Sequence, residues 1–266
     1  MTNFSENMKV TVIGAGNMGG ALVKGWMKTG CADITVTART RETLERLSAE
    51  YPSLDTSLDN AAAVKGADVI VLAVKPWLVG SVIEGIRDSI DFDRQVIMSV
   101  AANKFSDELR GCLGCPDAKV IYVMPNIAAE YGEAMSFVAP ADGVPEEDVD
   151  KVMQLMLKVG KVKRCTEAQV AAGNMLAGCG IAYVMRFIHA MMEGGVEMGL
   201  YPKDAQEIAM QAMKGAVAVL EGSGLHPEAA IDKVTTPGGL TIRGLNELDH
   251  AGFNSAVIRC LKAGLK

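Results

Sequence analysis

The sequence has few residues suited to metal or thiol chemistry. Its 266 residues include three histidines, which are widely separated, and six cysteines. Only Cys112 and Cys115, in the segment CLGC, are spaced like half of a zinc site or a redox pair, and no second pair follows them. A structural zinc site needs four such ligands. We therefore expect ordinary reduced cysteines and no bound metal.

An excess of positive charge is also missing. The formal net charge is -6, so the chain lacks the basic stripe that binds a phosphate backbone, and we expect no nucleic-acid partner. The first ten residues, MTNFSENMKV, have an acid and polar side chains where a signal peptide has a basic segment and then an apolar one. We expect a cytoplasmic protein.

No apolar stretch has the length of a membrane span. The candidate runs from Val170 to Met185, contains Asn174 and several glycines, and is followed at once by Arg186. A span needs about 20 apolar residues. This stretch predicts a helix packed inside protein, and we expect no membrane partner.

Strand and helix patterns alternate through residues 1–165, which predicts an α/β domain with a parallel sheet covered by helices. The predicted strands are Lys9–Ile13, Ile34–Thr37, Val69–Ala73, Val96–Val100, Val120–Val123, Ala134–Val138 and Val162–Cys165, with helices at Gly16–Lys28, Arg41–Tyr51, Trp77–Ser89 and Glu146–Val159.

The strand pattern ends near residue 165, and residues 166–266 are predicted to form an all-α domain. Its apolar, methionine-rich helices from Val170 to Met198 are too hydrophobic to face water, so we expect them to be buried between subunits of at least a dimer. The predicted helices are Gln169–Cys179, Ile181–Met198, Lys203–Glu221, Pro227–Val234, Thr241–Leu248 and Phe253–Lys262.

A glycine-rich turn, VIGAGNMGG at residues 12–20, directly follows the first predicted strand. Gly14, Gly16 and Gly19 fit the pattern G-x-G-x-x-G, in which the glycines permit a tight turn, close approach of a pyrophosphate, and helix–strand packing. The pyrophosphate would lie at the helix N-terminus. The turn therefore predicts dinucleotide binding by Gly14, Ala15, Gly16, Asn17, Met18 and Gly19, and a purely structural glycine turn is the alternative.

The end of the second strand bears on which dinucleotide binds. An acid there would accept from the ribose 2′-OH of NAD, but the sequence reads TVTARTR and has no acid. Arg39, with Thr40 and Arg41, can instead meet the 2′-phosphate of NADP, because a guanidinium matches phosphate geometry. The alternative is that both arginines are solvated surface at a helix start. We predict NADP, with NADPH preferred over NADH.

A second motif, TTPGGLT at residues 235–241, runs straight into a helical pattern. Its Pro-Gly-Gly turn can direct backbone N–H groups to one point, and the hydroxyls of Thr236 and Thr241 flank it. This is a plausible pocket for a carboxylate, backed by a helix dipole. A plain capped loop between helices explains the same residues, and the two interpretations remain open on chemistry alone.

Several segments together resemble the pyrroline-5-carboxylate reductases, which perform the last step of proline synthesis. The resemblance covers nearly the whole chain, and its most specific segment is TTPGGLTIRGL at 235–245. The other segments are VIGAGNMGGAL at the start, ADVIVLAVKP at 67–76, VMPN at 123–126 and GEAMSFV at 132–138.

The resemblance implies an N-terminal Rossmann-type dinucleotide-binding domain and an all-α C-terminal domain that forms a homodimer, often assembled further into a ring of dimers. It implies reduction of 1-pyrroline-5-carboxylate to proline by hydride transfer from NAD(P)H. For the cofactor it adds Asn60 near the adenosine ribose, and Ala73, Val74, Lys75, Pro76, Ser99 and Ala101 at the strand ends near the nicotinamide. For the substrate carboxylate it implies Thr236, Gly238, Gly239, Leu240 and Thr241, with Thr241 near the ring nitrogen as the catalytic residue.

The chain departs from the family pattern in two places. AGCGIAY at 177–183 stands where the family usually reads S-G-S-G-P-A-Y, and Ile127 and Ala128 follow Met-Pro-Asn where Thr-Pro is usual. Both departures are on the expected substrate side. Two alternatives remain. One is a β-hydroxyacid-type NADP-dependent dehydrogenase, which has the same two-domain plan, and the other is a non-catalytic NADP-binding redox sensor, which the two departures keep open. The first typically uses a lysine on an interdomain helix, where this chain offers Arg186.

Overall fold

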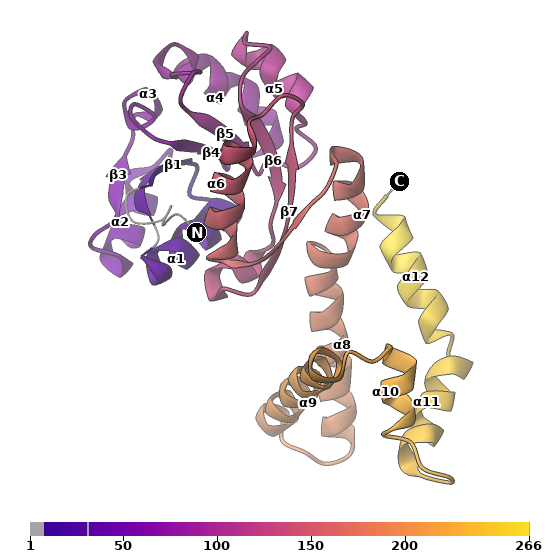
Figure 1. Ribbon diagram of the computed structural model, residues 1–266. Coiled ribbons are helices and arrows are strands. Elements are labelled where there is room, and N and C mark those ends of the chain that lie inside the picture. The colour runs from indigo at the N-terminus through magenta and orange to yellow at the C-terminus, as the bar shows by residue number, and fades with distance from the viewer. Residues whose placement is uncertain (1–7, 31, 266) are drawn as a thin grey trace. The chain divides into compact units, whose positions relative to one another are not determined.

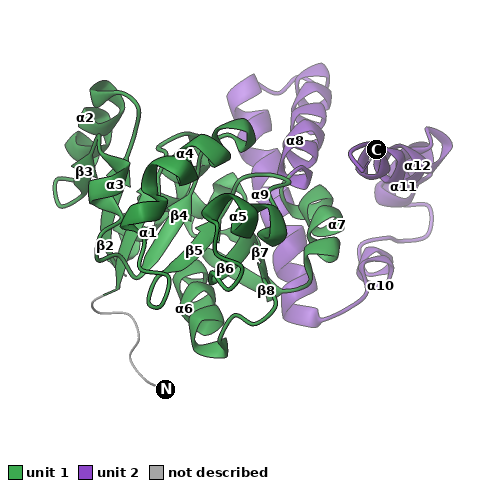
Figure 2. Cartoon of the chain, turned by 90° about the horizontal axis from the view of Figure 1, so that it is seen from above, with its two compact units in different colours: residues 1–178 green, residues 179–266 purple. Residues whose placement is uncertain are grey.

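The computed structural model describes residues 8–30 and 32–265, which divide into two compact units (Figures 1 and 2). Residues 1–7, on which the expectation of no signal peptide partly rests, lie outside the described residues. The first unit ends at Gly178 and the second begins at Cys179. The last strand of the first unit ends at Arg164, close to the domain boundary expected near residue 165. The next helix, α7 (Glu167–Ala177), packs on the sheet through Val170 and so belongs to the first unit.

The first unit contains one eight-stranded sheet with the strand order β3-β2-β1-β4-β5-β6-β7-β8. The order reverses between β1 and β4, which is the switch point where open α/β sheets bind ligands. The strands are β1 (Lys9–Ile13), β2 (Asp33–Thr37), β3 (Asp55–Ser57), β4 (Val69–Leu72), β5 (Val96–Ser99), β6 (Val120–Met124), β7 (Ala134–Pro140) and β8 (Gly160–Arg164).

Neighbouring strands are parallel except for β6 and β7, which pair antiparallel. Residues 125–133 join these two strands and hold only the short 3-10 helix η3 (Ile127–Tyr131). A parallel crossover needs about a dozen residues or more, usually with a helix, so this connection reverses the chain direction. The expected parallel sheet is therefore correct for most of the sheet and wrong for this pair.

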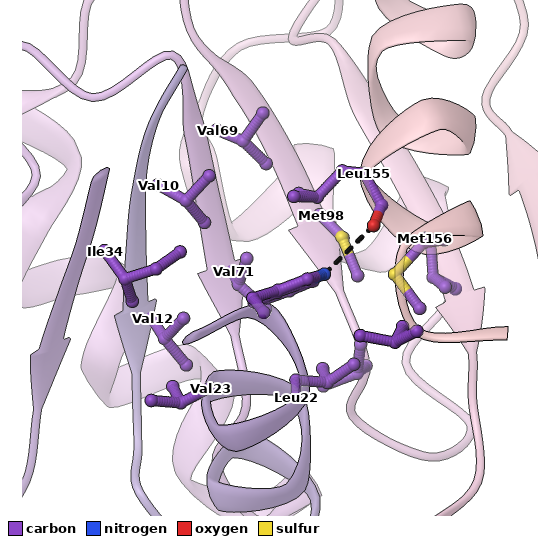
Figure 3. Close-up of a cluster of buried hydrophobic side chains, with 14 of the residues drawn as sticks. Val10, Val12, Leu22, Val23, Ile34, Val69, Val71, Met98, Leu155 and Met156 are labelled. Carbon is purple, nitrogen blue, oxygen red and sulfur yellow. Dashed lines mark hydrogen bonds between the residues drawn. The ribbon is translucent and has the colours of Figure 1, made fainter. Parts of the chain in front are cut away.

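Helices cover both faces of the sheet, because strand side chains alternate between the two faces. One face packs against α1 (Asn17–Thr29), α2 (Arg41–Glu50) and α6 (Glu146–Leu157). The other packs against α4 (Val79–Ile86) and α5 (Ser106–Leu113). Figure 3 shows the first of these cores, in which the indole N–H of fully buried Trp26 donates to Leu155 O at 3.0 Å.

The second unit is entirely helical in its described residues. Its helices are α8 (Gly180–Glu197), α9 (Pro202–Ser223), α10 (Pro227–Asp232), α11 (Leu240–His250) and α12 (Phe253–Ala263). Only five of its described residues are buried, and all are glycine or alanine: Gly180, Gly195, Ala205, Ala209 and Ala230. Large apolar side chains are exposed instead, with Met198 81% and Ile208 55% accessible. The unit by itself has almost no hydrophobic core.

One helical stretch, Glu167–Glu197, is long and apolar enough to cross a membrane by length and composition alone. Its most apolar window has a mean hydropathy of 1.4, and 11% of that window is buried. The expectation that no apolar stretch has the length of a membrane span is therefore wrong by length and composition. The expectation that Val170–Met185 packs inside protein holds within the described chain for Val170, Met175 and Gly180, which are buried, whereas the other residues of this stretch are not.

Four elements were not predicted. The strand β3 has three residues, the helix α3 (Asn60–Ala63) has four, the 3-10 helix η3 has five, and α5 has eight. The helix predicted at Trp77–Ser89 divides into a 3-10 turn at Pro76–Leu78, α4, and a second 3-10 turn at Arg87–Ser89. The fold class itself is confirmed.

Candidate active site

The turn between β1 and α1 has the conformation that its glycines predict. Gly14 follows β1 with φ 106°, a left-handed conformation that favours glycine. Its N–H donates to Thr37 O at 3.0 Å, which fixes the turn to the end of neighbouring β2. Gly16 is the N-cap of α1, and no described side chain caps that end. The helix therefore presents free N–H donors and the positive end of its dipole.

The surroundings of the three glycines test whether the turn suits a pyrophosphate. A Cβ at Gly14 would lie 2.7 Å from Ala73 O, and one at Gly19 would lie 2.0 Å from Gly14 O. Neighbouring backbone therefore leaves no room for a side chain at Gly14 or Gly19. A Cβ at Gly16 would meet nothing within 4 Å. The middle glycine alone leaves open space, at the helix end where a pyrophosphate would approach, so the residues present fit a dinucleotide.

The ends of three parallel strands lie side by side next to this turn. Ile13, Leu72 and Ser99 are neighbours in the sheet register. Backbone hydrogen bonds continue one residue further, from Ala73 N to Ile13 O at 2.9 Å and from Val100 N to Leu72 O at 3.1 Å. The carboxyl ends of β1, β4 and β5 thus form one edge, at the switch point of the sheet.

The predicted residues on this edge differ in exposure. Ala73, Val74 and Pro76 are half-buried, and Lys75 is exposed. Ser99 and Ala101 are buried, with Ser99 Oγ 3.4 Å from Ala101 N. These two residues line the edge mainly through their backbone.

Asn60 is held by a contact that no sequence pattern predicted. Thr37 Oγ1, at the buried end of β2, donates to Asn60 Oδ1 at 2.6 Å. This bond fixes the orientation of the carboxamide and leaves its NH₂ group available as a donor. Asn60 therefore lies beside the end of β2, where an adenosine ribose would lie in such a fold.

The N-terminus of α2 carries the residues predicted to bind a 2′-phosphate. Thr40 is the N-cap of α2, and its hydroxyl bonds that of Thr43 at 2.9 Å rather than a backbone N–H. Arg39 and Arg41 are exposed and form no ion pair with any described residue. The helix end therefore combines free N–H donors with two unpaired guanidinium groups.

Asn126, the last residue of VMPN, was not among the predicted site residues. It is 5% exposed. Its Oδ1 accepts from Ala128 N at 3.1 Å, which caps η3, and its Nδ2 donates to Ala177 O at 3.1 Å. The amide thus joins the loop after β6 to the last turn of α7. The motif was a visible signal, but its contact with a residue 51 positions away was not.

The substrate motif forms a tight turn at the start of α11. Gly239 N donates to Thr236 O at 2.9 Å, and Gly238 has φ 70°. Gly239 is the N-cap of α11, and no described side chain caps that end. A Cβ on Gly239 would lie 2.5 Å from Thr236 Oγ1, so the turn packs tightly on itself.

Side chains around this turn are open to solvent in the described chain. Leu240 is 83% accessible, and Thr241 is also exposed. Arg243 donates to Gly238 O at 2.8 Å, which closes the turn from the helix side. The arrangement offers free backbone N–H groups and a threonine hydroxyl at one helix end, which are suitable partners for a carboxylate.

The departing segment AGCGIAY spans the end of α7 and the start of α8. Within the second unit, a hydrogen bond with Cys260 raises the pKa of Tyr183. The segment therefore contacts α12 through the phenol of Tyr183, which meets the thiol of Cys260. The Met-Pro-Asn departure is also on the surface, since Ile127 is 48% exposed.

The structure brings the predicted dinucleotide residues together on one unit, around the ends of β1, β2, β4 and β5. The predicted substrate residues lie together on the other unit, around the N-terminus of α11. Among residues 8–30 and 32–265, no group of three or more His, Cys, Asp or Glu side chains could hold a metal ion.

Comparisons with known proteins cover both units. A family model described as NADP oxidoreductase, coenzyme F420-dependent, matches residues 9–103, and one described as pyrroline-5-carboxylate reductase dimerisation matches residues 167–266. The pyrroline-5-carboxylate reductase of Methanosarcina acetivorans is 35% identical over 261 residues, which is 96% of each chain.

A further relative and a solved structure are similar to almost the whole chain. Pyrroline-5-carboxylate reductase 1 of Dictyostelium discoideum is 33% identical over 94% of this chain, which spans about half of that protein's length, 47%. The crystal structure of Plasmodium falciparum pyrroline carboxylate reductase with NADP bound has a TM-score of 0.88 and 25% identity, over 98% of this chain and 96% of that one.

Proposed function

Because this chain belongs to the pyrroline-5-carboxylate reductase family of NAD(P)H-dependent oxidoreductases, we propose that it reduces 1-pyrroline-5-carboxylate to proline in the final step of proline synthesis. The observation that carries the proposal is the pairing of two preformed sites. One is the β1–α1 turn with its single open glycine position, and the other is the TTPGG turn at an uncapped helix end. We assign cofactor binding to residues 1–165, which lie in the first unit, and substrate binding with dimerisation to residues 166–266, which comprise α7 and the second unit.

In this proposal the first unit binds NADPH through its strand ends. Residues 14–19 hold the pyrophosphate, Asn60 contacts the adenosine ribose, and the backbone of Ala73–Pro76 and of Ser99–Ala101 lies along the nicotinamide side. When bound, the cofactor supplies the hydride that the imine carbon accepts. Arg39 and Thr40 favour NADPH over NADH, because only NADPH carries the phosphate that an unpaired guanidinium can bind.

The second unit binds the substrate carboxylate at the start of α11. Backbone N–H groups of Gly238, Leu240 and Thr241 donate to it, whereas the N–H of Gly239 already donates to Thr236 O and shapes the turn. The helix dipole adds favourable electrostatics. Thr241 contacts the ring nitrogen through its hydroxyl. This hydroxyl orients and relays a proton, since a threonine is too weak an acid to supply one unaided. Holding the imine against the cofactor then provides much of the rate.

We propose that the second unit forms a homodimer in the cytoplasm, and that such dimers can assemble further into a ring. The support for the dimer is the exposed apolar surface of this unit and its match to a dimerisation family. Many exposed large apolar side chains on one unit are typical of an interface between subunits.

Steady-state oxidation of NADPH with the cyclic imine tests the proposal. Thr241→Ala should lower kcat/KM roughly five- to 150-fold, which corresponds to a loss of about 1–3 kcal/mol of transition-state stabilisation. It should leave the dissociation constant for NADPH unchanged. A cyclic imine that lacks the carboxylate should be a poor substrate for both proteins.

Three outcomes would contradict parts of the proposal. Tight NADPH binding without turnover would support the redox-sensor alternative. Turnover of a β-hydroxyacid with NADP, but not of the imine, would support the dehydrogenase alternative. Full activity of Thr241→Ala would place the carboxylate pocket elsewhere.

A further inference from the structure

The loop after β5 contains a backbone conformation that its residue type disfavours. Asn103 has φ 57°, and among the described residues it is the only non-glycine residue with a positive φ. It lies in a turn that Lys104 N closes by donating to Ala101 O at 3.2 Å. Left-handed backbone is sterically costly for residues with a Cβ, although asparagine tolerates it better than most.

One buried side chain holds this turn. Tyr122 on β6 is 1% exposed, and its hydroxyl accepts a hydrogen bond from Asn103 N at 3.2 Å. Its ring makes an edge-to-face contact with Phe105, with centroids 5.3 Å apart. Burial raises the pKa of Tyr122, so the phenol stays neutral at physiological pH.

The far end of the same loop is fixed from α7. Glu167 Oε1 accepts from Ser106 N at 2.8 Å and from Ser106 Oγ at 2.6 Å, at the start of α5. The near end is fixed in the sheet through Ser99. Between these two anchors, the Asn103–Tyr122 bond is the side-chain tether of the turn.

We propose that Tyr122 is a positioning residue for the reductase reaction: its hydroxyl holds the Asn103 amide in the left-handed turn and thereby fixes the Ser99–Ala101 strand end. This inference rests on the proposed function, in which that strand end lies along the nicotinamide side of the cofactor. Tyr122 itself is buried beneath the edge and acts only through the loop.

Tyr122 can have this effect because a disfavoured left-handed turn relaxes when no hydrogen bond holds it. If the backbone N–H of Asn103 loses its acceptor, the φ of Asn103 in the turn Ala101–Lys104 can relax to a negative value. The backbone of Ala101 belongs to this turn, so relaxation moves the edge that contacts the cofactor. Glycine adopts positive φ at no steric cost, so the tether should matter less when Asn103 is replaced by glycine.

The test compares Tyr122→Phe, Asn103→Gly and the double variant. Tyr122→Phe removes one hydroxyl and keeps the buried ring. Tyr131→Phe is the matched control, because Tyr131 is 74% exposed and no hydrogen bond of its hydroxyl is found within the described chain. The readouts are amide exchange at Asn103 in the cofactor-free protein, the dissociation constant for NADPH, and the KM values for NADPH and imine.

We expect Tyr122→Phe to speed exchange of the Asn103 amide several-fold in the cofactor-free protein. It should weaken NADPH binding by about two- to tenfold and change the KM for the imine by less than twofold. In the Asn103→Gly background, Tyr122→Phe should weaken NADPH binding by less than about twofold. Tyr131→Phe should change none of these values.

Two results would overturn the inference. Equal losses of NADPH affinity from Tyr122→Phe in both backgrounds would mean that Tyr122 acts through packing alone. Unchanged NADPH affinity with faster amide exchange would mean that the turn does not position the cofactor edge. Failure of the unmodified protein to reduce the imine would refute the proposed function instead, while amide exchange and NADPH binding would still decide the role of Tyr122.

Discussion

Replacing the glycines of the β1–α1 turn one at a time separates folding from cofactor binding. In Gly19→Ala, the new Cβ would lie 2.0 Å from Gly14 O and 2.9 Å from Ala73 Cβ. Neither neighbour is the end of a flexible side chain, so the backbone of helix or turn must move. In Gly16→Ala, the new Cβ meets nothing within 4 Å, and the φ of -73° and ψ of -169° suit alanine.

The two variants should therefore differ in stability. Overpacking typically costs about 1–3 kcal/mol, and overlap with backbone places Gly19→Ala at the upper end of that range. For a unit of this size, each kcal/mol lowers Tm by about 2–4 °C, so we expect a fall of about 6–12 °C. Gly16→Ala should change the free energy of unfolding by less than about 0.5 kcal/mol.

Cofactor affinity should instead depend on Gly16, because this is the position that the protein leaves open. A methyl group there occupies the space through which the pyrophosphate approaches the helix end. We expect Gly16→Ala to raise the dissociation constant for NADPH at least tenfold, or about 1.4 kcal/mol. The variant would thus be folded and deficient in binding.

Thermal unfolding without cofactor and fluorescence titration with NADPH measure the two effects. Gly85→Ala is the matched control, since its Cβ also meets nothing within 4 Å and it lies in the last turn of α4, far along the chain from the β1–α1 turn. It should bind NADPH normally. Normal NADPH affinity in Gly16→Ala would refute the assignment of the turn, and unchanged Tm in Gly19→Ala would refute the packing argument.

Three further predictions concern charge and assembly. Arg39→Ala should raise the KM for NADPH about ten- to 100-fold and that for NADH less than twofold, whereas equal changes would reject a 2′-phosphate contact. Light scattering at micromolar concentration should show at least a dimer, and an active monomer would contradict burial of Val170–Met198 between subunits. Burial raises the pKa of Asp148, but hydrogen bonds from Lys151 and Lys119 outweigh it and hold that pKa below its usual range. Asp148→Asn should therefore cost about 1.5–3 kcal/mol at pH 7 by urea unfolding, and the difference from the unmodified protein should shrink as pH falls below about 4, where the native carboxylate protonates.

Hydrophobic periodicity was sufficient to predict the long elements of the first unit. Strands such as β1 and β4 are fully or largely buried runs of β-branched residues, and their predicted bounds agree with the structure within one residue. The strand β3 is Asp-Thr-Ser and only three residues long, so it has no apolar alternation to detect. Its pairing with β2 is an edge contact, made by backbone alone.

The glycine turn was predictable residue by residue, because each glycine has a local steric reason. The neighbouring contacts were not, because they join distant segments. Thr37 and Asn60 are 23 residues apart, and Asn103 and Tyr122 are 19 apart. No local pattern marks a threonine that orients a carboxamide or a tyrosine that holds a left-handed turn. Both follow from the strand order, which places unrelated loops at one edge.

The apolar helices α7 and α8 suit a protein interface better than a lipid environment. The 31-residue stretch Glu167–Glu197 is apolar enough for a membrane span, but it is interrupted at Gly178 and Cys179, between α7 and α8. The α8 part also carries Arg186 and Glu193. Charged side chains distributed along an otherwise apolar helix suit an interface that buries one face and leaves another in water, which lipid does not offer.

In the proposed function, part of the substrate site should depend on more than one chain. Only glycine and alanine are buried among the described residues of the second unit, so this unit buries little apolar surface of its own. The family match to a dimerisation domain over residues 167–266 supplies a partner as a second copy of the chain. Thr241 and Leu240 are exposed in the described chain, and in the proposed function completion of the substrate site should depend on dimer formation.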